Sequence, residues 1–334
     1  SHPGVRKDSS GYALADYARS GELLELLVGS EGTLAIFVGI ELSLAALPGA
    51  TSSLVAEFAT LEQAVDGAAR ARIGGASACE LLDRTFIDVA RSGPALVAID
   101  GASEAVLLIE IEAGDAASAA ATAKVMEQAM RSSGATHVSV ALSADDEARL
   151  WALRHAASPI LNRLSPSLKS MQFIEDAAVP PERLPQYVRG VREILARHDV
   201  RGVIFGHAGD SHVHVNPLID VTREGWRDRV RGILADVVAL TARLGGTLAG
   251  EHGDGRLRTA LSATSWDADA RTLFARVKHA FDPAGIFNPG VKVPLRGQSA
   301  LGAIKYDPAL TPLPDDARRV LDRVAADRAY ARSR

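Results

Sequence analysis

The sequence has few of the residues that mark several classes of protein. It holds one cysteine, Cys79, so no disulfide can form within the chain, which fits a reducing compartment. Aromatic residues make up 5% of the chain, and its 37 lysines and arginines do not outnumber its 41 acidic residues. A nucleic-acid groove needs clustered basic residues with interleaved aromatics. We therefore expect no nucleic-acid partner, and a cytoplasmic location or one at the cytoplasmic face of a membrane.

Long apolar runs are also missing. The most apolar stretches, residues 23–28 and 33–47, are interrupted by glutamate. Both fall short of the roughly 20 apolar residues that a membrane-spanning helix needs. The chain begins with neither a methionine nor an apolar signal core, so we expect the true N-terminus to lie upstream. The sequence predicts no transmembrane segment.

The composition is that of a folded protein, with 47% hydrophobic and 23% charged residues in 334 positions. Strand and helix patterns alternate twice after Pro48, which predicts an α+β fold. We expect two ferredoxin-like halves to form an antiparallel sheet covered by helices on one face. Cys79 falls in a run that reads as helical, where a buried structural thiol is expected. The predicted strands are 34–47, 52–58, 105–113, 136–142, 170–179, 200–208 and 212–219, and the predicted helices are 60–74, 79–92, 116–134, 181–199, 222–245, 266–290 and 315–334.

The segment GHAGDSHVHVNP, residues 206–217, is rich in ligand-type side chains. If HVHVN is a strand, its period of two places His212, His214 and Asn216 on one face. His207 comes just before the intervening turn, so two short strands would bring it beside His214. Imidazoles joined through a tight turn suit zinc or another borderline divalent ion.

A second segment, GGTLAGEHGDGR, places Glu251 next to His252 between glycines. Glu251 would complete a set of two histidines and one carboxylate with coordination positions left open. His252 is then free to act as an acid or a base. Alternatively, both segments are solvated turns whose histidines are satisfied by hydrogen bonds, but two such clusters favour a site.

Three segments in order carry a family resemblance: KDSSGYALADYARSGELLELLVGSEGTLAIF at 7–37, GHAGDSHVHVN with GEHGDGRLRT, and FDPAGIFNPGVKVP at 281–294. Together they resemble the C-terminal part of the FAD-linked oxidases of the vanillyl-alcohol-oxidase superfamily. D-lactate dehydrogenase, D-2-hydroxyglutarate dehydrogenase and the flavoprotein subunit of glycolate oxidase are members. The resemblance covers nearly the whole chain.

The resemblance implies FAD-dependent oxidation of a small D-2-hydroxy acid of the lactate, glycolate or 2-hydroxyglutarate class to the 2-oxo acid. It implies a divalent metal, zinc or manganese, bound by His207, His214 and Glu251. His252 would take the hydroxyl proton while a hydride passes to FAD. The residues it implies in substrate binding are Arg154 and Lys169, and those it implies in FAD binding are Gly29, Ser30, Glu31, Gly32, Thr33 and Asn288. Ser158, one helical turn after Arg154, and Asn216, on the strand face of His214, are further candidates for substrate binding.

The sequence departs from the family at two places. Position 212 is histidine where relatives often have asparagine, so His212 adds a ligand, tunes the metal or marks a subfamily. The glycine-rich loop that binds the FAD pyrophosphate is not among these residues, so we expect a fragment that is inactive alone. The electron acceptor would be an electron-transfer protein, a cytochrome, a quinone or a fused iron–sulfur domain.

The resemblance also divides the chain into four segments. Residues 1–47 would be the remnant of the FAD-binding domain and 48–264 the substrate or cap domain. Residues 265–294 would return to the FAD domain, and 295–334 would be a linker and a helix towards a further domain. Two other functions stay open: a metal-dependent hydrolase, because the same ligands can activate water, and a non-catalytic module that binds a metal or a partner.

Overall fold

The computed structural model describes residues 4–91, 99–141, 143–161, 167–302, 304, 307 and 309–327, with only the backbone described at 155–161 and 325–327. The chain forms two compact units, Ser1–Gly302 and Ala303–Arg334. The described part of the second unit contains helix α12 (Asp315–Asp327). No helix in the described ranges combines the length and apolarity needed to cross a bilayer.

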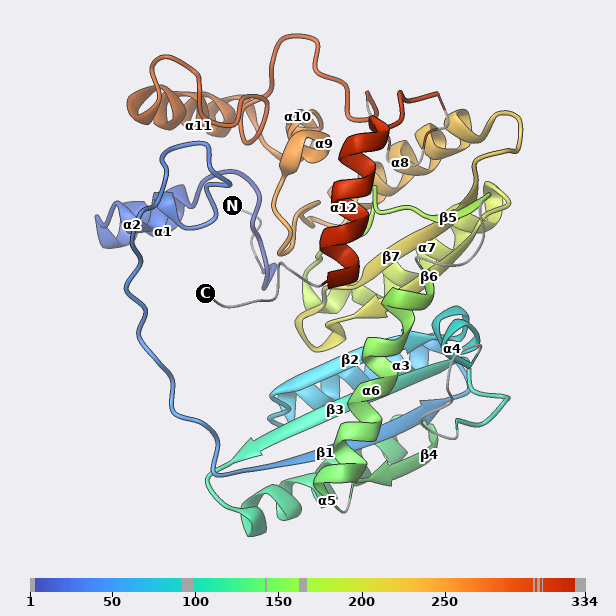
Figure 1. The fold of residues 1–334 in the computed structure, drawn as a ribbon. Helices are drawn as coiled ribbons and strands as arrows, with labels where there is room; N and C mark the ends of the chain where they lie inside the picture. The colour runs from blue at the N-terminus through green and yellow to red at the C-terminus, as the bar shows by residue number, and fades with distance from the viewer. Residues whose placement is uncertain are drawn as a thin grey trace. The chain divides into compact units, whose positions relative to one another are not determined.

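A seven-stranded sheet forms the centre of the first unit, in the order β4-β1-β3-β2-β6-β7-β5 (Figure 1). All neighbouring strands pair antiparallel. Strands β1 to β4 with α3 and α5 form a β-α-β-β-α-β half, and β5 to β7 with α7 and α8 form a smaller half. The strands are β1 (Ala50–Phe58), β2 (Ala78–Asp83), β3 (Ala105–Ala113), β4 (Ala135–Val140), β5 (Leu168–Ser170), β6 (Arg201–Gly206) and β7 (His214–Asp220).

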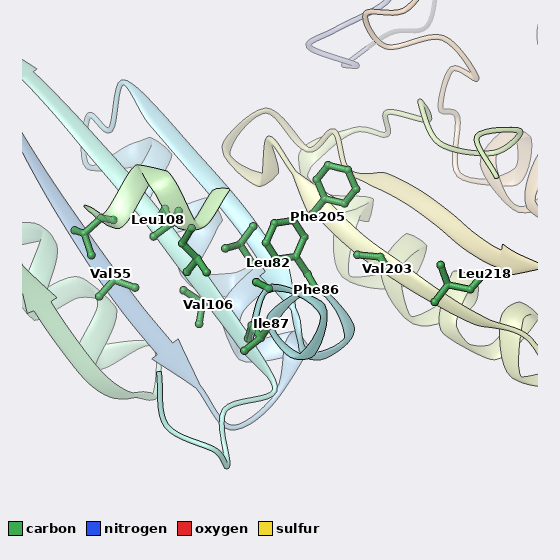
Figure 2. Packing of buried hydrophobic residues seen from close by; sticks show 12 residues of the cluster. Val55, Leu82, Phe86, Ile87, Val106, Leu108, Val203, Phe205 and Leu218 are labelled. Atoms are coloured by element: carbon green, nitrogen blue, oxygen red, sulfur yellow. The ribbon is translucent and has the colours of Figure 1, made fainter. Parts of the chain in front are cut away.

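The two halves meet at a short seam between β2 and β6. This ladder contains two residue pairs, Leu81↔Gly206 and Leu82↔Phe205. Side chains from both halves continue the contact, and Figure 2 shows Leu82 and Phe86 packed near Phe205 in one apolar cluster. The seam therefore joins the two halves of the sheet with little backbone pairing, and side chains from both halves form one apolar cluster across it.

Both faces of the larger half are buried. On one face, α3 packs so closely that a side chain at Gly67 would meet Phe58 and Leu107. On the other face, α4 and α6 cover a cluster that includes Val55 and Leu108 (Figures 1 and 2). The prediction of an antiparallel sheet covered by helices is confirmed, but the helices lie on both faces.

The helices predicted at 60–74, 116–134, 181–199 and 222–245 are present as α3, α5, α7 and α8, the one predicted at 266–290 is the shorter α11, and α1, α2, α6, α9 and α10 lie outside the predicted helix ranges. Helix α3 begins at Leu61, after Thr60, whose hydroxyl accepts a hydrogen bond from the Gln63 amide as an N-cap. The helices of the first unit are α1 (Leu14–Ser20), α2 (Leu24–Leu27), α3 (Leu61–Ile73), α4 (Arg84–Arg91), α5 (Ala116–Ser132), α6 (Ala144–Leu161), α7 (Leu184–Arg197), α8 (Trp226–Arg243), α9 (Gly255–Thr259), α10 (Ser262–Ser265) and α11 (Ala268–Phe281), with 3-10 turns at Pro181–Arg183 and Ala208–Asp210.

The structure corrects the predicted strands at 34–47. From residue 35 this segment runs outside any strand or helix and is largely exposed, with Val38 98% and Leu44 95% exposed. A strand needs a neighbour for its backbone donors and acceptors. None pairs with it among the described residues, so its β-branched composition alone does not make a strand.

Other predicted elements were wrong in type or length. The helix expected at 79–92 is β2 followed by α4, with Asp83 between them accepting a hydrogen bond from the Phe86 amide. Cys79 therefore lies in a strand; it is buried as predicted, and burial raises the pKa of its thiol. A short apolar run does not distinguish a buried strand from a helix by periodicity. The strand expected at 170–179 is wrong: β5 ends at Ser170, and residues 171–179 lie outside any strand except for isolated bridges at Ala178. Strand β7 begins at His214, so His212 lies before it and makes an isolated bridge to Ala178.

Candidate active site

The candidate site is built where loops of the smaller half meet. The loop between β6 and β7 carries His207 and His212, and β7 begins with His214. The turn after α8 carries Glu251 and His252. Residues 178 and 179 link the two segments: Ala178 exchanges main-chain hydrogen bonds of 2.9 and 3.1 Å with Thr247, and the Val179 amide donates to the Ser211 carbonyl oxygen at 3.2 Å. Residues distant in sequence thus converge on one point.

Three imidazoles surround the Glu251 carboxylate. Nε2 of His207 lies 3.2 Å and Nε2 of His214 lies 3.4 Å from Oε1 of Glu251. Nδ1 of His212 lies 3.8 Å from Oε2. Each of the four side chains offers a ligand atom, and these atoms lie within 4.8 Å of one another. Imidazole and carboxylate donors in this number suit a divalent transition metal.

The other nitrogen of each imidazole is held by an oxygen. Nδ1 of His207 contacts the Glu80 carboxylate. Nδ1 of His214 donates to the Glu175 carbonyl oxygen at 3.0 Å, and Nε2 of His212 lies 2.9 Å from Oδ1 of Asp176. Outer hydrogen bonds of this kind fix the ring orientation and tautomer of metal-binding histidines. The hydrogen bonds behind the three histidines are therefore also of the kind found around bound metals.

Asp176 fixes the turn that carries Glu251 and His252. Its buried carboxylate accepts the main-chain amides of His252 at 3.0 Å and of Glu251 at 3.3 Å. The position before Glu251 must be glycine, because a Cβ at Gly250 would lie 2.7 Å from Nε2 of His212. The positions of Glu251 and His252 are thus fixed by their main-chain hydrogen bonds to Asp176 and by the close packing of Gly250 against His212.

His252 lies at the rim of the cluster, with its side chain 49% exposed. Its ring stacks on that of His214 at 5.1 Å, and its Nδ1 lies 2.8 Å from Oε2 of Glu175. Nε2 lies 3.5 Å from Oε1 of Glu251. Because the ionised Glu175 can only accept, Nδ1 carries the hydrogen and Nε2 keeps its lone pair. His252 therefore has the geometry of a base oriented by a carboxylate.

The electrostatics of the cluster keep its carboxylates ionised. Burial raises the pKa of Glu175, but His214 beside it and the charges of Arg258 and His252 lower it to about 2. For Glu251, burial likewise opposes ionisation, and the hydrogen bond from Lys7 at 2.8 Å together with nearby imidazoles lowers the pKa to about 2.

The histidines differ in their electrostatic environment. The Glu80 contact raises the pKa of His207, whereas burial lowers the pKa of His212 and favours its neutral form. A neutral imidazole has one donor and one acceptor nitrogen. His212 is thus suited to offer a lone pair.

The structure brings some of the predicted substrate residues to this site. Nε of Arg154 contacts Oε2 of Glu80 at 2.6 Å, so Arg154 is linked to His207 through one carboxylate. Asn216 lies two residues after His214 and shares its sheet face; its buried Oδ1 has no partner among the described residues.

The structure does not bring Lys169 to this group, and it leaves Ser158 untested. Lys169 pairs with Ile219, which alternates with Leu218 and lies on the sheet face opposite to His214 and Asn216. The side chain of Ser158 lies outside the described residues. The roles assigned to both stay predictions.

The segment predicted to approach FAD is tied into the same unit. The side-chain amide nitrogen of Asn288 donates to the Glu31 carbonyl oxygen at 2.7 Å, and this hydrogen bond joins the two segments predicted to bind FAD. The Glu31 carboxylate accepts the amides of Asp254 and Gly255 at 2.8 and 2.9 Å. The Thr33 hydroxyl lies 2.6 Å from that of Tyr12, whereas the buried Ser30 hydroxyl has no hydrogen-bond partner among the described residues. The side chains of Glu31, Thr33 and Asn288 are therefore held by the protein, and that of Ser30 is unsatisfied.

The main chain of this segment stays accessible. Gly29 and Gly32 have φ of +73° and +68°, and a Cβ at either would meet nothing within 4 Å. Glycine in this conformation lets another group approach the backbone closely. The residues present therefore fit a cofactor that contacts the loop through its main chain.

The carboxylates that hold the histidines were not among the predicted site residues. Glu80 is a buried acidic residue in the largely apolar strand β2, and Glu175 and Asp176 are adjacent acids in an otherwise apolar stretch. An acidic residue inside an apolar run is costly to bury without a partner. That pattern was a usable signal, although it does not name the partner.

Comparisons with known proteins agree with this architecture. The family model of the FAD linked oxidases, C-terminal domain, matches residues 47–291. The chain is 30% identical to the glycolate oxidase subunit GlcD of Escherichia coli K12, over 88% of this chain and 58% of that protein. It is 31% identical to the D-lactate dehydrogenase of Archaeoglobus fulgidus, over 85% and 59%.

Solved structures show a similar fold. The 4-ethylphenol oxidase from Gulosibacter chungangensis superposes with a TM-score of 0.53 at 14% identity, over 75% of this chain and 55% of that one. The chain spans 58% and 59% of the lengths of the two relatives named above. With the match over residues 47–291, the chain belongs to the family of FAD linked oxidases, through their C-terminal domain.

Proposed function

We propose that this chain is the substrate-handling part of an enzyme that uses FAD to oxidise a D-2-hydroxy acid of the lactate, glycolate or 2-hydroxyglutarate class. One observation carries the proposal. Nε2 of His252 lies at the rim of a cluster in which His207 and His214 converge on Glu251. A base beside a cation pocket suits removal of the proton from a hydroxyl group.

A divalent metal, zinc or manganese, would be held by His207, His214 and Glu251. When bound, it would lower the cost of negative charge on the hydroxyl oxygen. The outer contacts of His207 and His214 keep the ligand nitrogens pointed towards Glu251. The histidines themselves therefore need little rearrangement to bind an ion.

His252 would accept the hydroxyl proton at Nε2. Glu175 holds Nδ1 at 2.8 Å and remains ionised, so it orients the ring and stabilises the imidazolium that forms. Arg258 pairs with the same carboxylate, which limits its movement. The His252 ring would therefore keep the same orientation before and after it accepts the proton.

Arg154 would bind the substrate carboxylate. Its guanidinium lies over the Phe205 ring at 4.9 Å. Glu80 contacts Nε, and the two terminal nitrogens of the guanidinium would bind the substrate carboxylate. Asn216 would supply a further hydrogen bond from the same sheet face. Ser158 and Lys169 are proposed on the sequence alone, because the Ser158 side chain lies outside the described residues and Lys169 lies on the opposite sheet face.

FAD would accept the hydride from the carbon that bears the hydroxyl. Residues 29–33 and Asn288 would contact it, with the main chain of Gly29 and Gly32 open to approach. The bond between Asn288 and Glu31 supports assigning 1–47 and 265–294 to one FAD-binding part and 48–264 to the cap. An electron-transfer protein, a cytochrome or a quinone would then reoxidise the flavin.

The test uses the full-length enzyme that contains this chain. Mixed without oxygen with D-lactate, glycolate or D-2-hydroxyglutarate, it should lose its oxidised-flavin absorbance with at least one of them and not with L-lactate. His252→Asn should slow this by about 10²- to 10⁴-fold without loss of metal. The matched control is His198→Asn, which removes a histidine that pairs with Asp236 outside the site. No bleaching with any 2-hydroxy acid would refute the proposal.

A further inference from the structure

We propose that His212 is a fourth protein ligand of the metal, so that three imidazoles and one carboxylate surround it. This inference rests on the metal site proposed at His207, His214 and Glu251.

The contacts of His212 fix its tautomer. Its Nε2 lies 2.9 Å from Oδ1 of Asp176, and both side chains have no exposed surface. Asp176 also accepts the amide of His252, which is the pattern of an ionised acceptor. Nε2 therefore carries the hydrogen, and Nδ1 is left with a lone pair.

That lone pair is unsatisfied. Nδ1 of His212 is buried and has no hydrogen-bond partner in the described structure. A buried polar atom without a partner costs about 1–3 kcal/mol, so native proteins keep few of them. Its nearest charged neighbour given by the structure is Oε2 of Glu251 at 3.8 Å, which is itself an acceptor. Two acceptors at this distance repel each other, and a cation bound by both would relieve that repulsion.

The ring cannot turn to another partner. Gly250 packs against His212 so closely that a Cβ there would lie 2.7 to 3.1 Å from three ring atoms. The rings of His207 and His214 lie 5.7 and 4.8 Å away, centroid to centroid. Lys7 supplies a cation to Oε2 of Glu251 but makes no hydrogen bond to Nδ1 of His212. The lone pair is thus directed into the proposed metal site.

His212 also repeats the arrangement of the two ligands already proposed. Each of the three imidazoles has one nitrogen against a protein oxygen and the other directed at Glu251. Imidazole-rich sites suit zinc, iron, copper and nickel, whereas manganese favours oxygen ligands. A third imidazole should therefore shift the preference of the site from manganese towards zinc.

The first test measures metal affinity by competition with a chromophoric chelator, using the metal-free full-length enzyme. Zinc affinity should fall at least about 100-fold in His212→Asn, as in His214→Asn, because losing an outer contact alone costs about 10- to 100-fold. The ratio of zinc to manganese affinity should fall as well. His198→Asn, which removes a histidine with the same 2.9 Å contact to an aspartate, should leave both values unchanged.

The outcomes separate this inference from the proposed function. If His212→Asn binds zinc like the wild type while His214→Asn does not, His212 is no ligand and the three-residue site stands. If the wild type binds no divalent metal, the proposed site itself is wrong and this inference fails with it.

A second measurement needs no variant of this buried residue. The proton NMR spectrum of the Co²⁺-loaded wild type should show three exchangeable, hyperfine-shifted N–H signals. They belong to the nitrogens of His207, His212 and His214 that face Glu80, Asp176 and the Glu175 carbonyl. Two such signals would overturn the inference.

Discussion

The two halves of the sheet share an arrangement of strands and helices but differ in how completely their strands pair. In the larger half, β1 and β3 pair over nine residues each, and both faces are packed with apolar side chains. In the smaller half, β7 begins only at His214, and the residues before it make one isolated bridge. Among the described residues, both clusters able to hold a metal lie in the smaller half. The candidate site thus occupies the part of the fold where the strand ladder stops and side chains from several segments converge.

The largest effect should come from emptying the core of the larger half. Leu107, fully buried in β3, packs beside Gly67 of α3, and Leu107→Ala should lower the free energy of unfolding by about 2–5 kcal/mol. Denaturant unfolding measures this, with Val125→Ala on the exposed face of α5 as the control. Zinc affinity of the folded variant should not change. A parallel loss of affinity would show that the halves are not independent.

The second effect is a pH dependence that arises at Asp83, at the end of β2. Burial raises the pKa of this carboxyl from its ordinary value of 3.8 to about 7, although the Phe86 amide opposes this. Because the folded state holds the proton more tightly, stability should fall as the pH rises from about 4 to 7. The loss is at most about 4 kcal/mol, at 1.36 kcal/mol per pKa unit.

Asp83→Asn should remove that slope. The amide keeps an oxygen for Phe86 and cannot ionise, so the variant should be more stable than the wild type at pH 8. Thermal unfolding between pH 4 and 8 measures this, and Asp88→Asn in α4, whose carboxyl is 42% exposed, is the control. Equal slopes in the wild type and Asp83→Asn would contradict the assignment.

Glu80 is an exception to the division of roles between the two halves. It lies in the larger half, yet its carboxylate contacts His207 of the smaller half across the seam. Glu80→Gln should weaken zinc binding by about 10- to 100-fold, the cost of losing an outer contact. Glu57→Gln is the matched control: Glu57 is also buried in this half but bonds Ser103 instead. Competition titration measures both. Equal loss in the two variants would point to general destabilisation.

The smallest effect should come from a helix end remote from the site. Thr60→Ala removes the N-cap of α3 and should lower the free energy of unfolding by about 1 kcal/mol, with zinc affinity unchanged. Thr60→Ser retains the hydroxyl and should restore most of the loss. If both variants unfold like the wild type, the cap is not stabilising.

The sequence was most informative where a pattern is local. The helix predicted at 60–74 is α3 at Leu61–Ile73, and His207 and His214 lie together across one turn as their spacing predicts. Glu251, 44 residues from His207, was grouped with them by its residue type and by the family resemblance. Long-range features escaped it. The partner of Glu80 lies 127 residues away, and Lys169 misses the histidine face by a single register position. The strand predicted at 34–47 depends on a neighbour that no local pattern supplies.

The two-pair seam between β2 and β6 also has a kinetic consequence. Contacts between segments far apart in sequence close large loops and slow the folding of a chain. His207 meets Glu80 only when the larger and smaller halves have joined, so its ring should gain its final orientation late in folding. Metal uptake followed during refolding would then report the joining of the halves, and it should lag behind the burial of the apolar core in β1 and β3.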